Sequence, residues 1–224
     1  MKKIIVLLFI GLSSLSLFSQ SKYSGGIEGG LAYSWFNPDN KKAENLSGRL
    51  AFTYGVFMDK KLSNTFSFSL GIFMLDAGGK LKYDHNIIVN TVEKRDTLKT
   101  FGDLTHRIKY IEIPFSIKGK TQEIGYITYF AKAGLNPMVP IKSRIDLNGA
   151  NFSDTDKDLN NLGEINLFGI GFHLGAGLEY SLGGSTAFIV ELLYSNNYLG
   201  IIRGNANDVK IASNFIQLKT GIKF

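Results

Sequence analysis

Histidine is the residue type in this sequence best suited to metal binding and acid–base chemistry, and it is sparse. The chain contains His85, His106 and His173 and no cysteine. His85 and His106 belong to one polar segment, but no third ligand follows at the spacing of a zinc site. The absence of cysteine excludes a disulfide scaffold, a thiol nucleophile and any Cys-ligated metal centre. These residues predict no metal and no cofactor.

Three aspartates have the spacing of the first ligands of a calcium-binding loop. Asp154, Asp156 and Asp158 alternate along the chain, as the first ligands of an EF-hand loop do. Such a loop needs Gly at its sixth position and Glu at its twelfth, where this chain has Leu159 and Ile165. We therefore interpret the aspartates as part of a solvated acidic loop.

The elements that position the remaining charged groups are predicted to be strands. Between Ile27 and Trp35 every second residue is apolar, and the residues between are small, polar or charged. This period of two is the signature of a strand with one apolar face. The same alternation recurs in seven further segments, at residues 49–58, 65–74, 110–118, 127–136, 168–180, 187–195 and 216–224.

The connections between these segments alternate strictly in length. The long, polar connections are residues 37–47, 77–106, 137–163 and 196–213, and the short ones are 59–64, 119–124 and 181–185. Barrels of outer membranes have long external loops and short periplasmic turns. We predict an all-β fold, an eight-stranded antiparallel up-and-down transmembrane β-barrel with both termini in the periplasm. A soluble eight-stranded barrel of the lipocalin kind is the alternative, with the apolar faces inside.

Three features favour the membrane barrel over the soluble one. The polar faces are rich in glycine and small residues, which suits the crowded interior of a narrow barrel. The chain also ends on a strand. Aromatic residues fall near strand ends on the apolar faces, as interface girdles do; they are Tyr33, Trp35, Tyr180, Tyr194 and Phe224.

The first residues have the layout of a secretory signal peptide. Lys2 and Lys3 precede an apolar run over residues 4–18, and the small Ser19 stands before a candidate cleavage point. The run is short for a transmembrane anchor. We divide the chain into a signal peptide, 1–19, and a barrel domain, 20–224. Removing Lys2 and Lys3 lowers the formal charge from +6 to +4, so charge alone does not indicate a nucleic-acid partner.

The polar faces of the strands carry acids and bases in near balance. Charges buried in a narrow barrel must pair, because burying one alone costs several kcal/mol. We predict a lumen charge network of Glu28, Arg49, Glu112, Lys132, His173, Glu179, Glu191, Lys219 and Lys223. A structural network that fills the lumen is our interpretation, since an eight-stranded barrel is just wide enough for side chains. A gated, narrow polar pore is the alternative.

Basic residues cluster in and beside the second long connection. They are Lys80, Lys82, Lys94, Arg95, Lys99 and Arg107. Such a segment is suited to attract the phosphates of lipopolysaccharide by charge. An exposed charged loop without a partner is the simpler interpretation.

Several segments resemble the outer-membrane β-barrel proteins of Gram-negative bacteria, in the form common among Bacteroidota. They are residues 110–115 (YIEIPF), the Gly-rich strand 168–180, residues 191–194 with 199–201, and the closing strand 216–224. The resemblance extends over the mature chain, and the strand with Pro114 and the closing strand are its most specific parts. It implies a location in the outer membrane.

The resemblance also implies partners. The barrel-insertion machinery would read the closing strand, whose insertion signal is Ile216, Leu218, Ile222 and Phe224. Outer-membrane lipid and lipopolysaccharide would surround the barrel. The family includes an accessory barrel of a secretion and gliding system, so a larger outer-membrane complex is a further candidate.

We predict that the chain is not an enzyme. We expect a structural, surface-interaction or assembly-accessory role with four long external loops, and a narrow diffusion pore for small polar solutes is the alternative. The third hypothesis is a lipid-modifying enzyme. Barrel enzymes that act on lipid A use a His–Ser pair on one wall, and His173 and Ser195 fall on neighbouring predicted strands with inward parity. No further motif supports that pair.

Overall fold

A computed structural model gives the arrangement of most of the chain. It describes residues 22–39, 42–83, 87–90, 95–98, 103–148, 157–198 and 210–224. Several sequence predictions lie outside these residues, namely the signal peptide, His85, Lys94, Lys99, Asp154 and Asp156.

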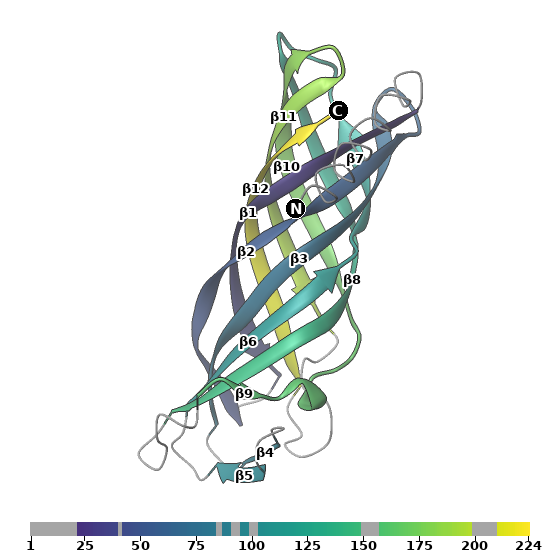
Figure 1. Cartoon of the computed structure of the whole chain (residues 1–224). Coiled ribbons are helices and arrows are strands. Elements are labelled where there is room, and N and C mark those ends of the chain that lie inside the picture. The colour runs from purple at the N-terminus through teal and green to yellow at the C-terminus, as the bar shows by residue number, and fades with distance from the viewer. Residues whose placement is uncertain are drawn as a thin grey trace, which may run out of the picture.

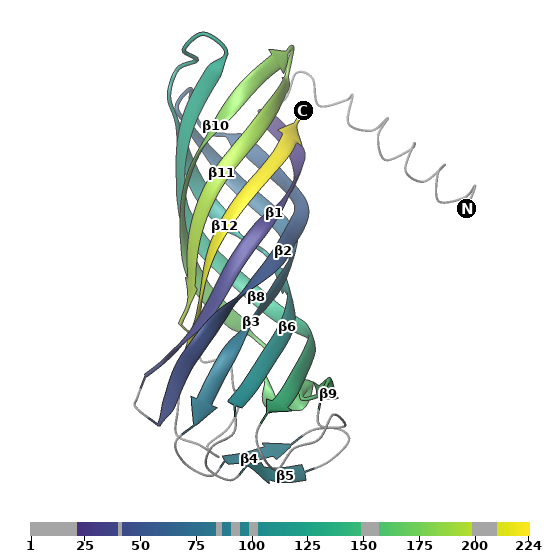
Figure 2. The same cartoon turned by 90° about the vertical axis from the view of Figure 1, so that its left-hand side faces the viewer.

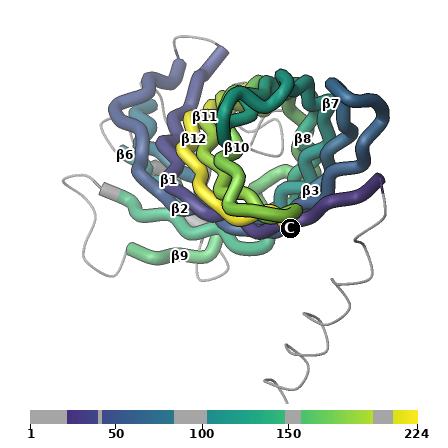
Figure 3. Tube along the Cα trace, turned by 90° about the horizontal axis from the view of Figure 1, so that it is seen from above, coloured from purple at the N-terminus to yellow at the C-terminus, as the bar shows by residue number. Residues whose placement is uncertain are grey.

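Across the described residues, eight antiparallel wall strands close into a ring, as predicted (Figure 1, Figure 3). The wall consists of β1 (Tyr23–Pro38), β2 (Ala43–Lys61), β3 (Phe66–Tyr83), β6 (Asp103–Glu112) with β7 (Phe115–Lys120), β8 (Ile127–Asn148), β10 (Gly169–Gly183), β11 (Thr186–Asn197) and β12 (Ile211–Lys223). Each strand pairs with its neighbours in sequence, and β1 pairs with β12 to close the ring. The small elements are β4 (Ile87–Asn90), β5 (Arg95–Leu98), β9 (Leu159–Asn160) and the 3-10 helix η3 (Leu162–Glu164).

Pro114 divides the fourth wall strand, which the sequence predicts as one unbroken segment. Proline has no backbone N–H to donate to the sheet, so β6 ends before it and β7 begins after it. The ladder is continued by neighbouring groups. The Ile113 N–H donates to the Pro137 carbonyl at 2.8 Å, and the Pro114 carbonyl accepts from the Gly71 N–H at 2.9 Å. The inward face therefore keeps its parity on both sides of the proline.

The two ends of the barrel differ. At one end, which we name the turn end, Gly26 pairs with Lys223 and short turns join β2 to β3, β7 to β8 and β10 to β11. The last of these turns is tight because Gly183 and Gly184 take positive φ values of 112° and 60°. The long connections lie at the opposite end, the loop end, where the β4–β5 hairpin is also found (Figure 2). Both ends of the described barrel chain thus lie at the turn end.

Three strands extend well beyond the predicted segments, which corrects the predicted loops 77–106 and 137–163. β3 runs to Tyr83, β6 begins at Asp103, and β8 runs to Asn148. The reason is an inversion of polarity along the strand. Up to Met74 the apolar residues of β3 other than Phe73 face outward, whereas beyond it they face inward and the outward residues are Asp76, Gly78, Lys80 and Lys82. A pattern search that expects one apolar face throughout reads this second half as a polar loop.

The outer surface around the middle of the barrel is apolar. Large side chains there are exposed, for instance Phe52 at 62% and Leu218 at 51%. Continuous apolar surface of this extent is not compatible with water, and it excludes the lipocalin-like alternative, which would place these residues inside. The lipid-facing belt consists of outward residues such as Ile27, Leu31, Tyr54, Val56, Leu70, Ile72, Ile117, Leu135, Leu174, Leu192, Ile216 and Leu218.

Aromatic rings border this belt on both sides. On the loop side, Tyr33 and Trp35 lie 5.9 Å apart between ring centroids, and Tyr194 lies 6.5 Å from Trp35. On the turn side, Tyr126 and Tyr180 lie 6.2 Å apart. Such rings are typical of membrane interfaces. Separately, no helix among the described residues is long and apolar enough to cross a membrane.

Candidate functional site in the barrel lumen

Ion pairs fill the lumen near the turn end. We name this group the turn-end ion cluster; it consists of Asp59, Lys118, Lys120, Glu179 and Lys223. Lys118 Nζ lies 3.2 Å from Asp59 Oδ2 and 2.7 Å from Glu179 Oε1, and only 4% of the Lys118 side chain is exposed. Lys120 Nζ lies 2.8 Å from the same Glu179 oxygen, and Lys223 pairs with the other oxygen. Every charge in this cluster therefore has an opposite neighbour.

A second group of charges lies next along the lumen. This mid-lumen cluster consists of Glu28, Glu112, Lys132, Glu191 and Lys219. Lys132 Nζ lies 2.8 Å from Glu191 Oε2. Glu112 is fully buried and lies within the electrostatic influence of Lys132 and Lys219. The turn-end cluster has one base more than acids and the mid-lumen cluster one acid more than bases, so together they balance.

Aromatic rings fill the space between the two clusters. Lys118 Nζ lies 4.1 Å from the centre of the Phe130 ring, and Lys219 Nζ lies 4.1 Å from that of Phe73. Such contacts stabilise a desolvated ammonium group. Inward glycines leave room for the rings: a Cβ at Gly177 would lie 2.7 Å from Phe130, and one at Gly55 would lie 2.7 Å from Phe73. The glycine-rich inner face is thus a packing requirement.

Little free space remains in this region. A cavity of about 10 Å³ is lined by Glu28, Phe57, Phe73, Lys118, Lys132 and neighbours. That volume is near the minimum that one water molecule needs. The side chains that line this cavity therefore leave space for about one water molecule.

His173 lies further toward the loop end, in a neutral polar layer. Its Nδ1 makes a hydrogen bond with Asn136 Oδ1. Ser195 is opposite His173 on β11 and accepts a hydrogen bond of 3.5 Å from Gln217 Nε2. His173 is 1% exposed and Ser195 is 0% exposed. The pair proposed from sequence is therefore brought onto one wall, but inside a packed layer that a lipid substrate cannot enter without rearrangement.

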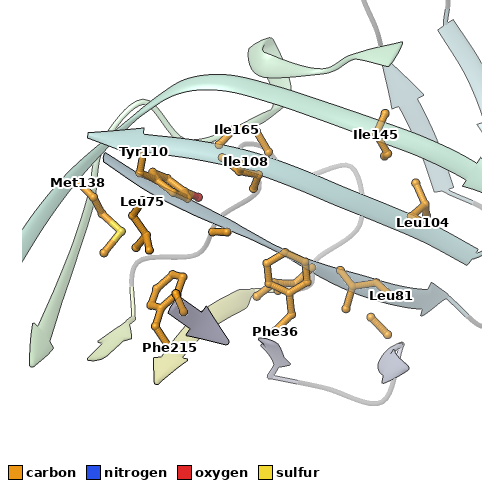
Figure 4. Packing of buried hydrophobic residues seen from close by; sticks show 14 of the residues in the cluster. Phe36, Leu75, Leu81, Leu104, Ile108, Tyr110, Met138, Ile145, Ile165 and Phe215 are labelled. Carbon is orange, nitrogen blue, oxygen red and sulfur yellow. The ribbon is translucent and has the colours of Figure 1, made fainter. Parts of the chain in front are cut away.

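An apolar plug closes the lumen at the loop end. Figure 4 shows Leu75, Tyr110 and Phe215 pointing toward one another from separate strands, with Phe36 beside them. These four side chains are at most 3% exposed. The rest of the plug comes from Ala32, Ala43, Ala77, Leu81, Tyr83, Leu104, Ile108, Met138, Ile145, Leu147, Leu159, Ile165 and Ile211. The loop-end half is thus built like a soluble protein, with its apolar residues inside.

The structure places most of the predicted network in these layers. Glu28, Glu112, Lys132, Glu191 and Lys219 form the mid-lumen cluster, and Glu179 and Lys223 belong to the turn-end cluster. Arg49 belongs to neither. Its backbone carbonyl accepts a hydrogen bond from Ser34 Oγ, and its side chain lies beside Gly78, nearer the plug.

Sequence reasoning missed three members of the turn-end cluster, Asp59, Lys118 and Lys120. Asp59 and Lys120 fell in segments assigned to turns, although β2 runs to Lys61 and β7 to Lys120. Lys118 has the inward parity of Glu112 but was not included in the network. Extending each segment by one or two residues with its parity unchanged would have found Asp59 and Lys120, and the parity alone would have found Lys118.

No group of three or more His, Cys, Asp or Glu side chains suited to hold a metal ion occurs in the described part of the chain. Asp158, the one described member of the predicted acidic loop, lies 3.2 Å from Arg107 Nη2. Arg107 also pairs with Asp146 Oδ1 at 2.6 Å.

Comparison with protein families agrees with this architecture. The family model described as "Outer membrane protein beta-barrel domain" matches residues 18–202. The chain belongs to this family. It is accordingly a protein of the outer membrane, and the resemblance seen in its strands is confirmed at the level of the family. The Bacteroidota form of that family stays a prediction.

Three solved structures are similar to this chain at low sequence identity. Neisserial surface protein A (NspA) is 14% identical with a TM-score of 0.49, covering 91% of this chain and 96% of that one. OprG from Pseudomonas aeruginosa is 13% identical with a TM-score of 0.46, covering 90% and 95%. Ail of Yersinia pestis, in complex with a heparin analogue, is 12% identical with a TM-score of 0.43, covering 90% and 99%. No curated protein matches the chain.

Proposed function

We propose that this outer-membrane barrel is a non-conducting, non-enzymatic protein with a structural or surface-interaction role. The single observation that carries the proposal is the filling of the lumen, by two ion clusters toward the turn end and by the apolar plug toward the loop end. When paired charges and packed side chains fill the lumen, the loops are the surface left to bind partners, as loops on a rigid scaffold commonly do.

The alternative, a narrow pore for polar solutes, needs a hydrated path. The plug opposes such a path because its residues are buried against one another, and its only polar side-chain groups are the hydroxyls of Tyr83 and Tyr110. Ions that entered the turn end would also have to separate pairs such as Lys118–Glu179, and breaking a buried pair costs about 3–5 kcal/mol.

The lipid-modifying alternative needs an accessible nucleophile and base. The burial of His173 and Ser195, and the use of His173 Nδ1 by Asn136, support a structural role for this pair. The carboxylates of the lumen are likewise engaged with lysines, or buried, in the two clusters.

Conductance tests the central claim directly. Purified protein in a planar bilayer should give no reproducible current steps, whereas a Phe36→Gly/Phe215→Gly variant, which removes two rings from the plug, serves as a positive control for channel opening. Steps from the wild-type protein at the same frequency as an established porin would reject the proposal and favour the pore.

The orientation in the membrane is part of the proposal. We propose that the loop end faces outside and that both termini lie in the periplasm, as the short turns at that end suggest. Because the chain has no cysteine, single cysteines can report accessibility. In intact cells, a membrane-impermeant maleimide should label Asp39→Cys at the loop end and not Asn64→Cys at the turn end. The reverse pattern would overturn the orientation.

We also propose that assembly depends on the closing strand. The Phe224 N–H donates to the Gly25 carbonyl at 2.8 Å, so the last residue takes part in closing the ring. Ile216 and Leu218 face outward into the lipid-facing belt. This supports recognition of the strand by the insertion machinery before the ring closes. Migration of the extracted protein in a native gel then separates a free barrel of about 25 kDa plus detergent from an accessory subunit of a larger complex.

A further inference from the structure

His106 on β6 is a buried histidine that packs against the apolar plug. The residue is 4% exposed, and within the described part of the chain neither Nδ1 nor Nε2 has a hydrogen-bond partner. Its ring packs edge to face on the Phe36 ring, with 5.8 Å between the ring centroids. Burying a polar group without a partner costs free energy. An imidazole at this position therefore needs a reason other than the stability of the plug.

The surroundings of His106 offer nothing that would hold a charged ring. Its partners in register are Gly79 on β3 and Ile145 on β8, and η3 contributes the apolar Ile165 to the plug. On the described wall strands of this half, the titratable or charged side chains with inward parity are Tyr83 on β3, Tyr110 on β6 and Arg49 on β2. The tyrosines stay neutral and the arginine stays charged between pH 4 and pH 8. None of the three is a carboxylate, so none can neutralise a protonated imidazole.

The wall at the level of His106 stands beyond the lipid-facing belt. The outward residues beside it are charged and paired with one another: Lys80 Nζ lies 2.8 Å from Asp103 Oδ2, and Arg107 Nη2 lies 2.6 Å from Asp146 Oδ1. Charged residues on the lipid face destabilise such barrels. This part of the wall is therefore in water, and protons from the solution have access to it.

The protonation of His106 is linked to the packing of the plug. Burial alone lowers the pKa of His106 from its ordinary value of 6.5 to about 4. The closed plug therefore holds a neutral ring, whereas a loosened plug that admits water lets the ring take up a proton near pH 6.5. The stability of the closed plug is then complete above pH 6.5 and is lost as the pH falls from 6.5 toward 4.

We propose that His106 is an acid-sensitive switch in the loop-end plug. When the ring takes up a proton, the charged imidazolium draws in water, because a buried charge without a partner is strongly unfavourable. The packing of Phe36 and Ile145 around the ring then loosens, and the loop-end half of the lumen opens to solvent. The inference goes beyond the proposed function, since it concerns the plug at acid pH and holds whether or not the lumen conducts at neutral pH.

The rate at which a plug cysteine is labelled tests this switch in the full-length protein. The reporter is Ala77→Cys, because Ala77 is a plug residue with 1% exposure and the chain has no other cysteine. The probe is 4,4′-dithiodipyridine, which reacts with thiols at acid and at neutral pH. Each rate is divided by that of Asp39→Cys, an exposed residue at the loop end, measured at the same pH.

Two further substitutions in the reporter background separate His106 from the other buried histidine. His106→Leu removes the titratable ring and keeps an apolar side chain, and His173→Gln is the matched control that leaves His106 in place. Unheated gel mobility at both pH values confirms that each variant is folded. If the leucine variant does not assemble, His106→Gln takes its place.

The pKa of His106 sets the size of the expected effect. Between pH 7.5 and pH 5.0 the normalised rate should rise about 25-fold in the reporter and in the His173→Gln control. It should rise less than about twofold in the His106→Leu variant. A reporter rate that does not change with pH would overturn the switch, and so would a rise that persists in His106→Leu.

Discussion

Replacing Lys118 with methionine tests the role of the buried charges in holding the barrel together. Lys118 pairs with Asp59 and Glu179 at 3.2 and 2.7 Å, and all three side chains are at most 6% exposed. Methionine has a similar length and keeps the contact with the Phe130 ring. The substitution therefore removes charge and leaves packing nearly unchanged.

The size of the effect follows from the partners that remain. Removing one member of a buried ion pair costs about 3–5 kcal/mol, because the other charge stays buried alone. Glu179 keeps Lys120 at 2.8 Å and also Lys223, whereas the one base in the described part of the chain that stays within ion-pair distance of Asp59 is Lys120 at 3.8 Å. We therefore expect a loss near the lower limit, about 3 kcal/mol, which is about 150-fold in the folding equilibrium constant.

Urea titration of the barrel in lipid vesicles measures this loss. Trp35 is the single tryptophan and borders the lipid-facing belt, so its fluorescence reports folding; unheated gel mobility is the second probe. The matched control is Lys80→Met, because Lys80 lies 2.8 Å from Asp103 with both side chains about one-third exposed. That variant should lose less than about 1 kcal/mol.

The comparison has a clear negative outcome. If Lys118→Met lost no more free energy of unfolding than Lys80→Met, the dependence of Asp59 and Glu179 on Lys118 would be refuted. A second substitution, Asp59→Asn, separates charge from packing. Added to Lys118→Met, it should restore part of the stability because the unpaired carboxylate is gone. No recovery would assign the loss to packing.

Three further predictions concern the belt, the inner glycines and the last residue. Leu192 and Leu62 are equally exposed, at 57% and 56%, but only Leu192 lies in the lipid-facing belt. Leu192→Arg should lower the free energy of unfolding in lipid vesicles by about 2–4 kcal/mol, and Leu62→Arg should lower it by less than about 1 kcal/mol. Equal losses would contradict the placement of the belt. Gly177→Ala should destabilise the barrel by about 1–3 kcal/mol in urea titration, because its Cβ would meet the Val190 backbone carbonyl and the Phe130 ring. Gly29→Ala, whose Cβ has ordinary contacts, should cost less than about 1 kcal/mol. Deleting Phe224 should block assembly in cells, and unchanged heat-modifiable mobility of the deleted protein would show that the insertion signal lies elsewhere.

Much of the fold was predictable because lipid-facing and inward residues alternate along a membrane strand. The alternation from Ile27 to Trp35 and the glycines of β10 sufficed to identify lipid-facing and inward faces. The loop-end half was not predictable in the same way. In β3, Ile72 and Met74 face outward, whereas Leu75, Ala77 and Leu81 face inward. The apolar face therefore changes side within one strand, and a search for a single apolar face does not detect the second half.

The sequence predicted which charged residues face the lumen, but it did not predict which of them form ion pairs with one another. Inward parity identified Glu112, Glu191 and Lys219 as lumen charges. It does not fix height along the barrel, and height decides which charges meet. Glu179 therefore pairs with Lys118 and Lys120, while Lys132 pairs with Glu191. Register across the ring, which depends on all eight strands, is the missing information.

The unequal lengths of the wall strands give the barrel a slanted rim. The 22 residues of β8 span about 70 Å, and at a tilt near 40° they rise about 55 Å. The 12 residues of β11 rise only about 30 Å, close to the thickness of the membrane. One side of the barrel thus stands some 25 Å taller than the other. With the loop end outside, as proposed, an antibody from solution would meet the tall face of β3, β6 and β8 first, whereas a second membrane protein can approach the low side within the bilayer.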